Sequence, residues 1–395
     1  MTFFAFPSSQ KPQFYFSNKK NAVIFFVNNF LFSKNAKIQF LINIIKFAFP
    51  HTFIYFLIKT ILTREKRLPH KISDAIDDIR EFIKTNRELF LLNSEKIEEI
   101  NFIIRNSKWQ RRNDKLAIIL FKNFDKHPFA VAKAGSVQHK SSIELEFSNT
   151  KTVYDKFKNS KSILIPEPIA FHISDKSALY FERAVEGMPF NDYLKLLSGK
   201  RRKDIYIDVL RNCKEQLVVF NCQEQFLSLE DFHKYFYNPL EVFSKTELGK
   251  RHSLKLKILK AQIDEILESK LISVWMHGDL WAGSILYNGK QAAIIDWEFF
   301  SRRGVPLWDF FLLVFYFGAV FNYFTDQDIS EIVDNSLLDL ATHCKIDKNY
   351  IPIIFQSYLL FNVQNRDTDK EKYWQNLLEH YWNVSDSKRS TNKLL

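Results

Sequence analysis

The chain has 395 residues and a formal net charge of +11 at pH 7, and 46% of its residues are hydrophobic and 16% aromatic. This length suits two or three domains, and the apolar content is enough for a large core, which excludes an intrinsically disordered chain. The positive charge favours anionic partners such as nucleotides, phosphorylated glycans, nucleic acid or acidic lipid headgroups, but it does not choose among them.

Cysteine usage indicates a reducing compartment. Cys213, Cys222 and Cys344 are far apart and have no paired Cys or His at metal-ligand spacing. This pattern argues against a disulfide framework and against a zinc site. We therefore expect a cytoplasmic protein.

Residues 1–67 are rich in Phe, Ile and Lys, and their densest apolar stretch covers residues 38–62. This stretch is too often interrupted to reach the roughly 18–20 apolar residues of a membrane span, because it contains Lys46, Pro50, His51 and Lys59. The N-terminal residues also lack the small-residue cleavage site of a signal peptide. Two interpretations stay open: a packed accessory subdomain, or an amphipathic basic helix that makes peripheral contact with the acidic inner face of the membrane.

The next part of the chain predicts a helix followed by a sheet. Residues 71–96 carry apolar residues at three- and four-residue steps, which predicts a linker helix and a domain boundary near residue 95. Five strands are expected after it, at residues 100–104, 116–121, 129–134, 169–173 and 178–181, with a helix at 141–157. The third strand ends near Lys133, and a cation inside an apolar strand needs an anionic partner, because burying it alone costs several kcal/mol. The alternative is a lysine that extends from the strand end into solvent.

From residue 188 onward the pattern is mainly helical. The expected helices cover residues 191–197, 203–222, 229–243, 254–271, 310–320, 329–343, 350–361 and 370–382. The four basic residues at 200–203 could bind an anionic acceptor, but a solvated charged face is the favoured interpretation.

The most informative stretch is His277-Gly-Asp-Leu-Trp-Ala-Gly-Ser-Ile-Leu, followed by the run 292–298. Asp279 follows an apolar run, Ser284 comes five residues later, and Asp296 ends a second apolar run. Three oxygen-bearing side chains are thereby placed at strand ends and in a tight turn, with a hairpin turn at Asn288-Gly289 between the strands. Phosphoryl-transfer enzymes keep their base and metal ligands in such positions. We expect Asp279 and Asp296 to face one cleft.

This pattern resembles the aminoglycoside phosphotransferase and choline kinase-like branch of the protein-kinase-like fold. The catalytic loop of that family reads His-Gly-Asp, four residues, Asn, and its metal aspartate follows in an Ile-Asp-Trp/Phe run. The resemblance implies that Asp279 is the catalytic base and that Asp296 is a magnesium ligand. Ser284 stands where the family has its metal-binding Asn. Its shorter hydroxyl could reach the ion only through water, or the second metal site could be lost.

The resemblance also implies the fold class and the domains. We expect an α+β, two-lobed protein-kinase-like fold, with a small antiparallel-sheet N-lobe over residues 96–186. A larger, mainly helical C-lobe over residues 187–395 would carry the catalytic loop, and residues 1–95 would form an N-terminal accessory segment. An aspartate at the position of Asp309 braces the catalytic-loop backbone in that family, although charge stabilisation of a helix N-terminus would also explain it.

By the same resemblance, Lys133 holds the phosphates of a nucleotide and pairs with a helix glutamate. We select Glu146 over Glu144, because the apolar residues 147, 153, 154 and 157 then share its inward stripe. Chain order alone places Glu182 and Ala184 in the hinge that binds the adenine edge through backbone groups. The connector 106–114 contains no glycine, so a Gly-rich phosphate loop is absent.

The function that the resemblance implies is an ATP-dependent, magnesium-using phosphotransferase acting on a hydroxyl of a small molecule or glycan. Residues 1–70 loosely resemble extensions on phosphotransferase-like proteins of bacterial surface-polysaccharide functions. The alternative is a catalytically degenerate kinase-like binding module, which Ser284 and the glycine-free connector favour and the presence of Lys133, Asp279 and Asp296 opposes. No nucleic-acid-binding motif is found, so no specific nucleic acid partner is expected.

Overall fold

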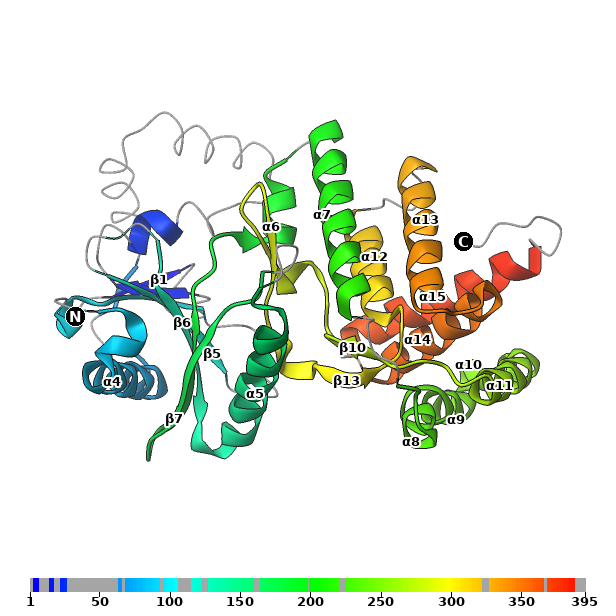
Figure 1. The fold of residues 1–395 in the computed structure, drawn as a ribbon, viewed down its shortest axis with the longest axis horizontal. Helices are drawn as coiled ribbons and strands as arrows, with labels where there is room; N and C mark the ends of the chain where they lie inside the picture. Colours follow the sequence, from blue (N-terminus) through cyan, green and yellow to red (C-terminus); the bar gives the residue numbers. More distant parts are fainter. Residues whose placement is uncertain are drawn as a thin grey trace. The chain divides into compact units, whose positions relative to one another are not determined.

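The computed structural model describes residues 3–6, 14–17, 22–26, 63–65, 68–92, 96–105, 115–122, 125, 127–159, 164–197, 199–220, 225–321, 327–365 and 368–387 (Figure 1). The apolar stretch 38–62, on which the two N-terminal interpretations depend, and the glycine-free connector 106–114 lie outside these residues. The chain forms two compact units. The first comprises Met1–Gly199 with Gly283–Glu298, and the second comprises Lys200–Ala282 with Phe299–Leu395.

The first unit is built on an antiparallel sheet whose strands are ordered β3-β1-β2-β4-β5-β6-β8-β7. The five strands predicted from the sequence are confirmed as β4 (Asn101–Arg105), β5 (Leu116–Phe121), β6 (Ala130–Ser136), β7 (Pro168–Ile173) and β8 (Ser177–Arg183). Three further strands continue this sheet beyond β4, namely β1 (Phe3–Phe6), β2 (Phe14–Ser17) and β3 (Thr63–Glu65). The N-terminal strands therefore share one sheet with the rest of this unit.

Helix α4 (His70–Thr85) packs on this sheet and is not a linker helix as predicted. Its buried positions follow the helical repeat at Ile72, Ala75, Ile76, Ile79 and Ile83. They share one apolar cluster with residues of β4, β5, β6 and β8, and Phe82 stacks on Phe181 with 5.0 Å between ring centroids. The sheet buries the apolar stripe that indicated a helix. In a free-standing linker this stripe would be exposed to water.

Helix α5 (Lys140–Phe157) covers the opposite face of the sheet (Figure 1). Successive residues of a strand point to opposite faces. Along β8, Leu179 and Phe181 belong to the cluster of α4, whereas Ala178 and Tyr180 pack with Ile143 of α5. Polar side chains of β5, β6 and β8 that point to the same face of the sheet as Tyr180 therefore face α5.

A small sheet with the order β12-β11-β9 completes the first unit. It consists of β9 (Met188–Pro189), β11 (Ile285–Tyr287) and β12 (Ala292–Ile294). The hairpin predicted at Asn288-Gly289 is confirmed, with Gly289 at φ +94° and the Asn288 side chain accepting the backbone N–H groups of Lys290 and Gln291. The hairpin places Ser284 and Asp296 at its open end, because the N–H of Ile295 donates to the carbonyl of Ser284 at 2.9 Å.

The second unit is mainly helical. Its helices are α7 (Gly199–Phe220), α8 (Leu229–Phe232), α9 (Asn238–Ser244), α10 (Glu247–Arg251), α11 (Ser253–Glu268), α12 (Trp308–Phe321), α13 (Gln327–His343), α14 (Ile351–Asn365) and α15 (Thr368–Ser387). The single helix predicted at 229–243 is interrupted by a π-helical turn at His233–Tyr237, which turns Tyr235 and Phe236 toward the ring of Trp308. Two short strands, β10 (Val274–Met276) and β13 (Ser301–Gly304), pair antiparallel.

Within the part of the chain that the structure describes, no helix has both the length and the apolar character of a membrane span.

Candidate active site

Lys133 lies at the centre of a buried charge cluster in the first unit. Its Nζ contacts Oε1 of Glu146 on α5 and lies 2.7 Å from Oδ1 of Asp296. Lys133 is 7% exposed and Glu146 is 2% exposed. Burial disfavours the charge of Lys133, but Asp296, Glu146 and Glu182 together outweigh burial and raise its pKa well above the usual range. Lys133 is therefore fully charged, and it joins the sheet, α5 and the turn after β12.

Glu182 belongs to this cluster through its side chain. Its Oε1 lies 3.7 Å from Nζ of Lys133, and its Oε2 accepts the hydroxyl of Tyr180 at 2.7 Å. Burial raises the pKa of Glu182, against the opposing effects of Lys133 and the Tyr180 hydroxyl. From the sequence, only the backbone of Glu182 is expected to take part in binding, through the adenine edge. Ala184, the other predicted hinge residue, donates its N–H to the carbonyl of Phe129 at 3.3 Å.

Asp296 adopts a backbone conformation that is uncommon for a residue with a side chain, with φ +66°. Its side chain is 56% exposed although it contacts the buried Lys133. Ser284, the residue at the position of the family's metal-binding Asn, is only 1% exposed. The hairpin thus places a half-exposed carboxylate and a buried hydroxyl at the same end.

The oxygen donors at this end of the hairpin, Asp296 and Ser284, suit a hard cation that takes most of its ligands from water and phosphate. Among the described residues, no group of three or more His, Cys, Asp and Glu side chains could hold a metal ion. Mg²⁺ usually binds one or two protein carboxylates and takes its other ligands from phosphate oxygens and water. Asp296, which carries negative charge and solvent exposure together, fits that mode of binding.

The loop that carries Asp279 lies in the second unit and follows β10. The N–H of Asp279 donates to Nδ1 of the fully buried His277 at 3.2 Å. Gly278 has φ +82°, and a Cβ at this position would lie 2.5 Å from the carbonyl oxygen of Phe299. Only glycine fits this conformation and this contact, so the shape of the loop requires glycine between His277 and Asp279. The Asp279 side chain is partly exposed.

Asp309, at the first turn of α12, braces this loop. Its Oδ2 accepts the N–H of His277 at 2.6 Å, and its Oδ1 accepts the N–H of Gly278 at 2.9 Å. Asp309 is 5% exposed, and burial raises its pKa, although His277 and the two N–H donors act in the opposite direction. The contacts are those of a backbone brace, and they are more specific than charge stabilisation of a helix N-terminus.

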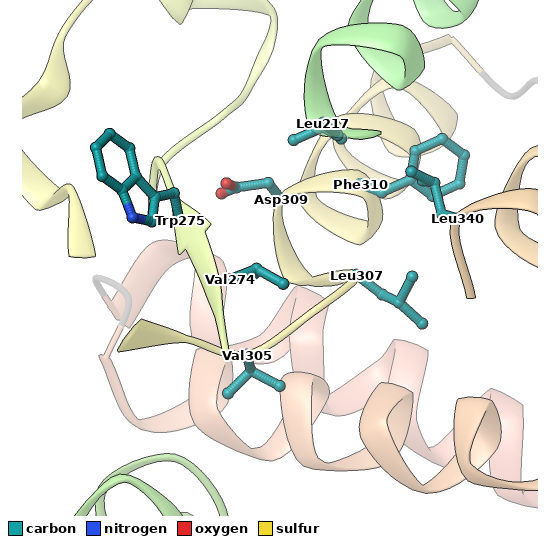
Figure 2. A pocket seen from close by; sticks show the side chains of 8 residues that line it. All are labelled: Leu217, Val274, Trp275, Val305, Leu307, Asp309, Phe310 and Leu340. Carbon is teal, nitrogen blue, oxygen red and sulfur yellow. The ribbon is translucent and has the colours of Figure 1, made fainter. Parts of the chain in front are cut away.

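A cavity of about 10 Å³ lies beside Asp309, which is room for about one water molecule. Figure 2 shows the Asp309 carboxylate directed toward β10, which carries Val274 and Trp275. The remaining lining residues are apolar: Leu217, Val305, Leu307, Phe310 and Leu340. Apart from Asp309, the cavity is thus lined mainly by apolar side chains.

The structure brings four predicted residues together in the first unit, namely Lys133, Glu146, Glu182 and Asp296. Asp279 is held in the second unit. Sequence reasoning missed Lys115 and Glu298, which extend the Lys133 cluster. Their signal was weak, because Lys115 borders a strand next to the connector and Glu298 follows the recognised Ile-Asp-Trp run.

An α+β architecture with a sheet lysine bonded to a helix glutamate, and with a His-Gly-Asp loop braced from a helix, is the arrangement of the protein-kinase-like fold class. Consistent with this class, residues 151–332 match the family model described as the phosphotransferase enzyme family. The resemblance inferred from the catalytic-loop residues is thereby confirmed over this segment.

Solved structures with a similar fold include three kinases. A choline kinase from Cryptosporidium parvum is 15% identical, with 82% of this chain and 98% of that chain covered and a TM-score of 0.48. Amicoumacin kinase is 12% identical, with 79% and 96% covered and a TM-score of 0.45. An aminoglycoside phosphotransferase from Streptomyces rimosus is 15% identical, with 66% and 88% covered and a TM-score of 0.37. No curated protein matches the chain by sequence.

Proposed function

We propose that the protein transfers a phosphoryl group from ATP to a hydroxyl of a small molecule or glycan, with Mg²⁺ as the required ion. The observation that supports this most strongly is the contact of one buried lysine, Lys133, with both Glu146 and Asp296. A fully charged lysine held beside an exposed aspartate suits the binding of a metal-bound polyphosphate.

In this proposal Lys133 binds the phosphates of ATP, and Glu146 holds the lysine in place. Lys133 would exchange part of its contact with Asp296 for phosphate oxygens, which keeps its charge paired in a buried site. Glu182 supports Lys133 from β8. The segment that includes Ala184 would bind the adenine edge through backbone groups, as predicted from its order in the chain.

Asp296 would hold Mg²⁺, which supplies charge neutralisation on the phosphates. Ser284 would contribute through a water molecule, because a serine hydroxyl is shorter than the amide of the family's Asn. Asp279 would orient the acceptor hydroxyl and accept its proton, with Asp309 fixing the backbone of the loop. Use of ATP is consistent with the cytoplasmic location expected from the sequence.

Calorimetric titration of ATP with Mg²⁺ into three variants tests this assignment. Asp296→Ala should weaken binding and abolish phosphoryl transfer, because the phosphates lose their bridging ion. Asp279→Ala should leave binding nearly unchanged and lower transfer by about 10²- to 10⁴-fold. Asp339→Ala is the matched control, since Asp339 forms an exposed ion pair with Lys214 and should have no effect.

The test also separates the second candidate, a binding module that has lost turnover. The buried Ser284 in place of an amide ligand favours that candidate. A module would bind ATP with Mg²⁺ but consume none with any acceptor in a panel of sugars, glycans and amino alcohols. If the wild type binds no ATP at millimolar concentrations, the phosphotransferase proposal is wrong.

A further inference from the structure

Lys115 is a second lysine on the face of the sheet that carries Lys133. In the register of β5 and β6, Ala117 lies opposite Lys133. Lys115 is two residues from Ala117, so its side chain points to the same face of the sheet. This is the face covered by α5, and the Lys115 side chain is 16% exposed there.

Lys115 links the α5 glutamate to the turn that follows Asp296. Its Nζ lies 3.2 Å from Oε2 of Glu146 and 3.0 Å from Oε1 of Glu298. Because Oε1 of Glu146 contacts Lys133, the two oxygens of this carboxylate are divided between two lysines. Glu146 is therefore held from both sides, and its orientation toward Lys133 depends on Lys115.

Helix α5 meets the same turn at two further points. The hydroxyl of Ser142 donates to Oε1 of Glu298 at 3.3 Å, and Nδ2 of Asn149 donates to the carbonyl of Trp297 at 3.0 Å. Ser142, Glu146 and Asn149 are spaced four and three residues apart, so they form one stripe on the helix. Lys115, like Lys133, contacts both this stripe and the turn.

We propose that Lys115 is a positioning residue that fixes Glu146 and Glu298, and with them the turn that carries Asp296, in the arrangement that binds metal-bound ATP. This inference rests on the proposed function. Without Lys115, Oε2 of Glu146 and Oε1 of Glu298 would lose the cation that they share, and the repulsion between the two carboxylates would displace the turn that carries Asp296. Lys115 acts on the neighbours of the metal ligand and makes no contact with the phosphates.

The first experiment measures the affinity for ATP with Mg²⁺ and with a chelator in place of Mg²⁺. Lys115→Met should weaken binding by about 10- to 100-fold with Mg²⁺, the usual cost of losing a group that orients a metal ligand. With the chelator the change should be smaller than about 3-fold, because Lys133 still contacts the phosphates. Lys115→Arg should restore the Mg²⁺-dependent affinity. Lys122→Met, at the other end of β5, is the control and should leave both affinities unchanged.

An equal loss of affinity with and without Mg²⁺ would show that Lys115 binds phosphate directly, and the positioning role would be wrong. An unchanged affinity in Lys115→Met would overturn it as well. A global folding defect is recognised because Lys115→Met would then lose the chelator-state affinity and the far-ultraviolet circular dichroism of the wild type.

A second experiment decides the inference even if the protein binds no ATP, in which case only the proposed function fails. The coupling between Lys133 and Glu146 is measured by a double-mutant cycle in unfolding, once with Lys115 present and once in the Lys115→Met background. The coupling should fall by about half or more in that background, since contacting groups of one network are non-additive. An unchanged coupling would refute the positioning role.

Discussion

Replacing Asp309 tests whether the aspartate braces the catalytic loop or only stabilises a helix end. Asp309→Ala leaves the N–H groups of His277 and Gly278 without their acceptor. Each buried, unpaired donor costs about 1–3 kcal/mol, so the expected loss of unfolding free energy is about 2–6 kcal/mol. The lower end applies if water enters the neighbouring cavity, which now has room for about one molecule. Asp309→Asn keeps one acceptor oxygen and should lose about half as much.

The assay is urea unfolding at constant m-value, with Glu247→Gln as the control. Glu247 also lies in the first turn of a helix, α10, but its side chain is 85% exposed and accepts no loop N–H. If Asp309→Ala costs no more than this control, the brace does not exist and the helix-charge interpretation is correct.

The pH dependence of the same variants provides a second check. Burial raises the pKa of Asp309 in the folded state, so the folded protein binds this proton more tightly than the unfolded chain does. For a raised pKa, the stabilising contribution is present at acid pH and is lost as the pH rises through the folded pKa. The difference in unfolding free energy between wild type and Asp309→Ala should therefore decrease as the pH rises above the pKa of an aspartate in the unfolded chain, which is about 4.

Three further predictions concern the loop, the metal and the membrane. Gly278→Ala should lower the unfolding free energy, measured by urea unfolding, by at least about 2 kcal/mol, because it adds a Cβ at positive φ and beside the Phe299 carbonyl. The control is Gly199→Ala, which should lower the unfolding free energy by less, because Gly199 has φ +49° but open space around it. Ser284→Asn should strengthen Mg²⁺-dependent ATP binding in calorimetry, and an unchanged Mg²⁺ dependence would mean that Ser284 does not face the ion. If residues 1–67 contact acidic membranes, the protein should sediment with anionic liposomes in low salt but not in high salt. Replacing Lys34, Lys37, Lys46 and Lys59 by Gln should prevent this sedimentation in low salt.

Much of the first unit could be predicted because its strands are short apolar runs separated by polar residues. The choice of Glu146 over Glu144 depended on one physical argument, that the pairing glutamate shares the buried stripe of its helix. The structure places Glu146 in that stripe, buried, while Glu144 is exposed. The helical periodicity of the apolar residues was sufficient to select Glu146, because α5 is a regular helix that packs through a single face.

Other features could not be predicted because they depend on register between distant segments. Glu182 was assigned from chain order, yet the alternation of Tyr180, Phe181 and Glu182 along β8 already indicated that Glu182 shares the face of Tyr180. Lys115 lies next to the connector, and nothing local shows that it meets Glu146 and Glu298. Likewise, a helical stripe predicts α4 but not its partner, so the sequence could not distinguish a linker from a helix packed on the sheet.

The pairing of the N-terminal strands with β4 makes a deletion of residues 1–67 a poor test of membrane contact. Strand β2 pairs with β4, and Ser17 exchanges hydrogen bonds with the backbone of Phe102. Removing residues 1–67 would expose the backbone groups of β4 along an edge that carries the apolar side chains of Phe102, Ile103 and Ile104. Such an edge promotes self-association with other chains. A truncated protein that sediments would therefore report aggregation as readily as lipid binding, and charge substitutions within the intact chain are the sounder probe of a membrane contact.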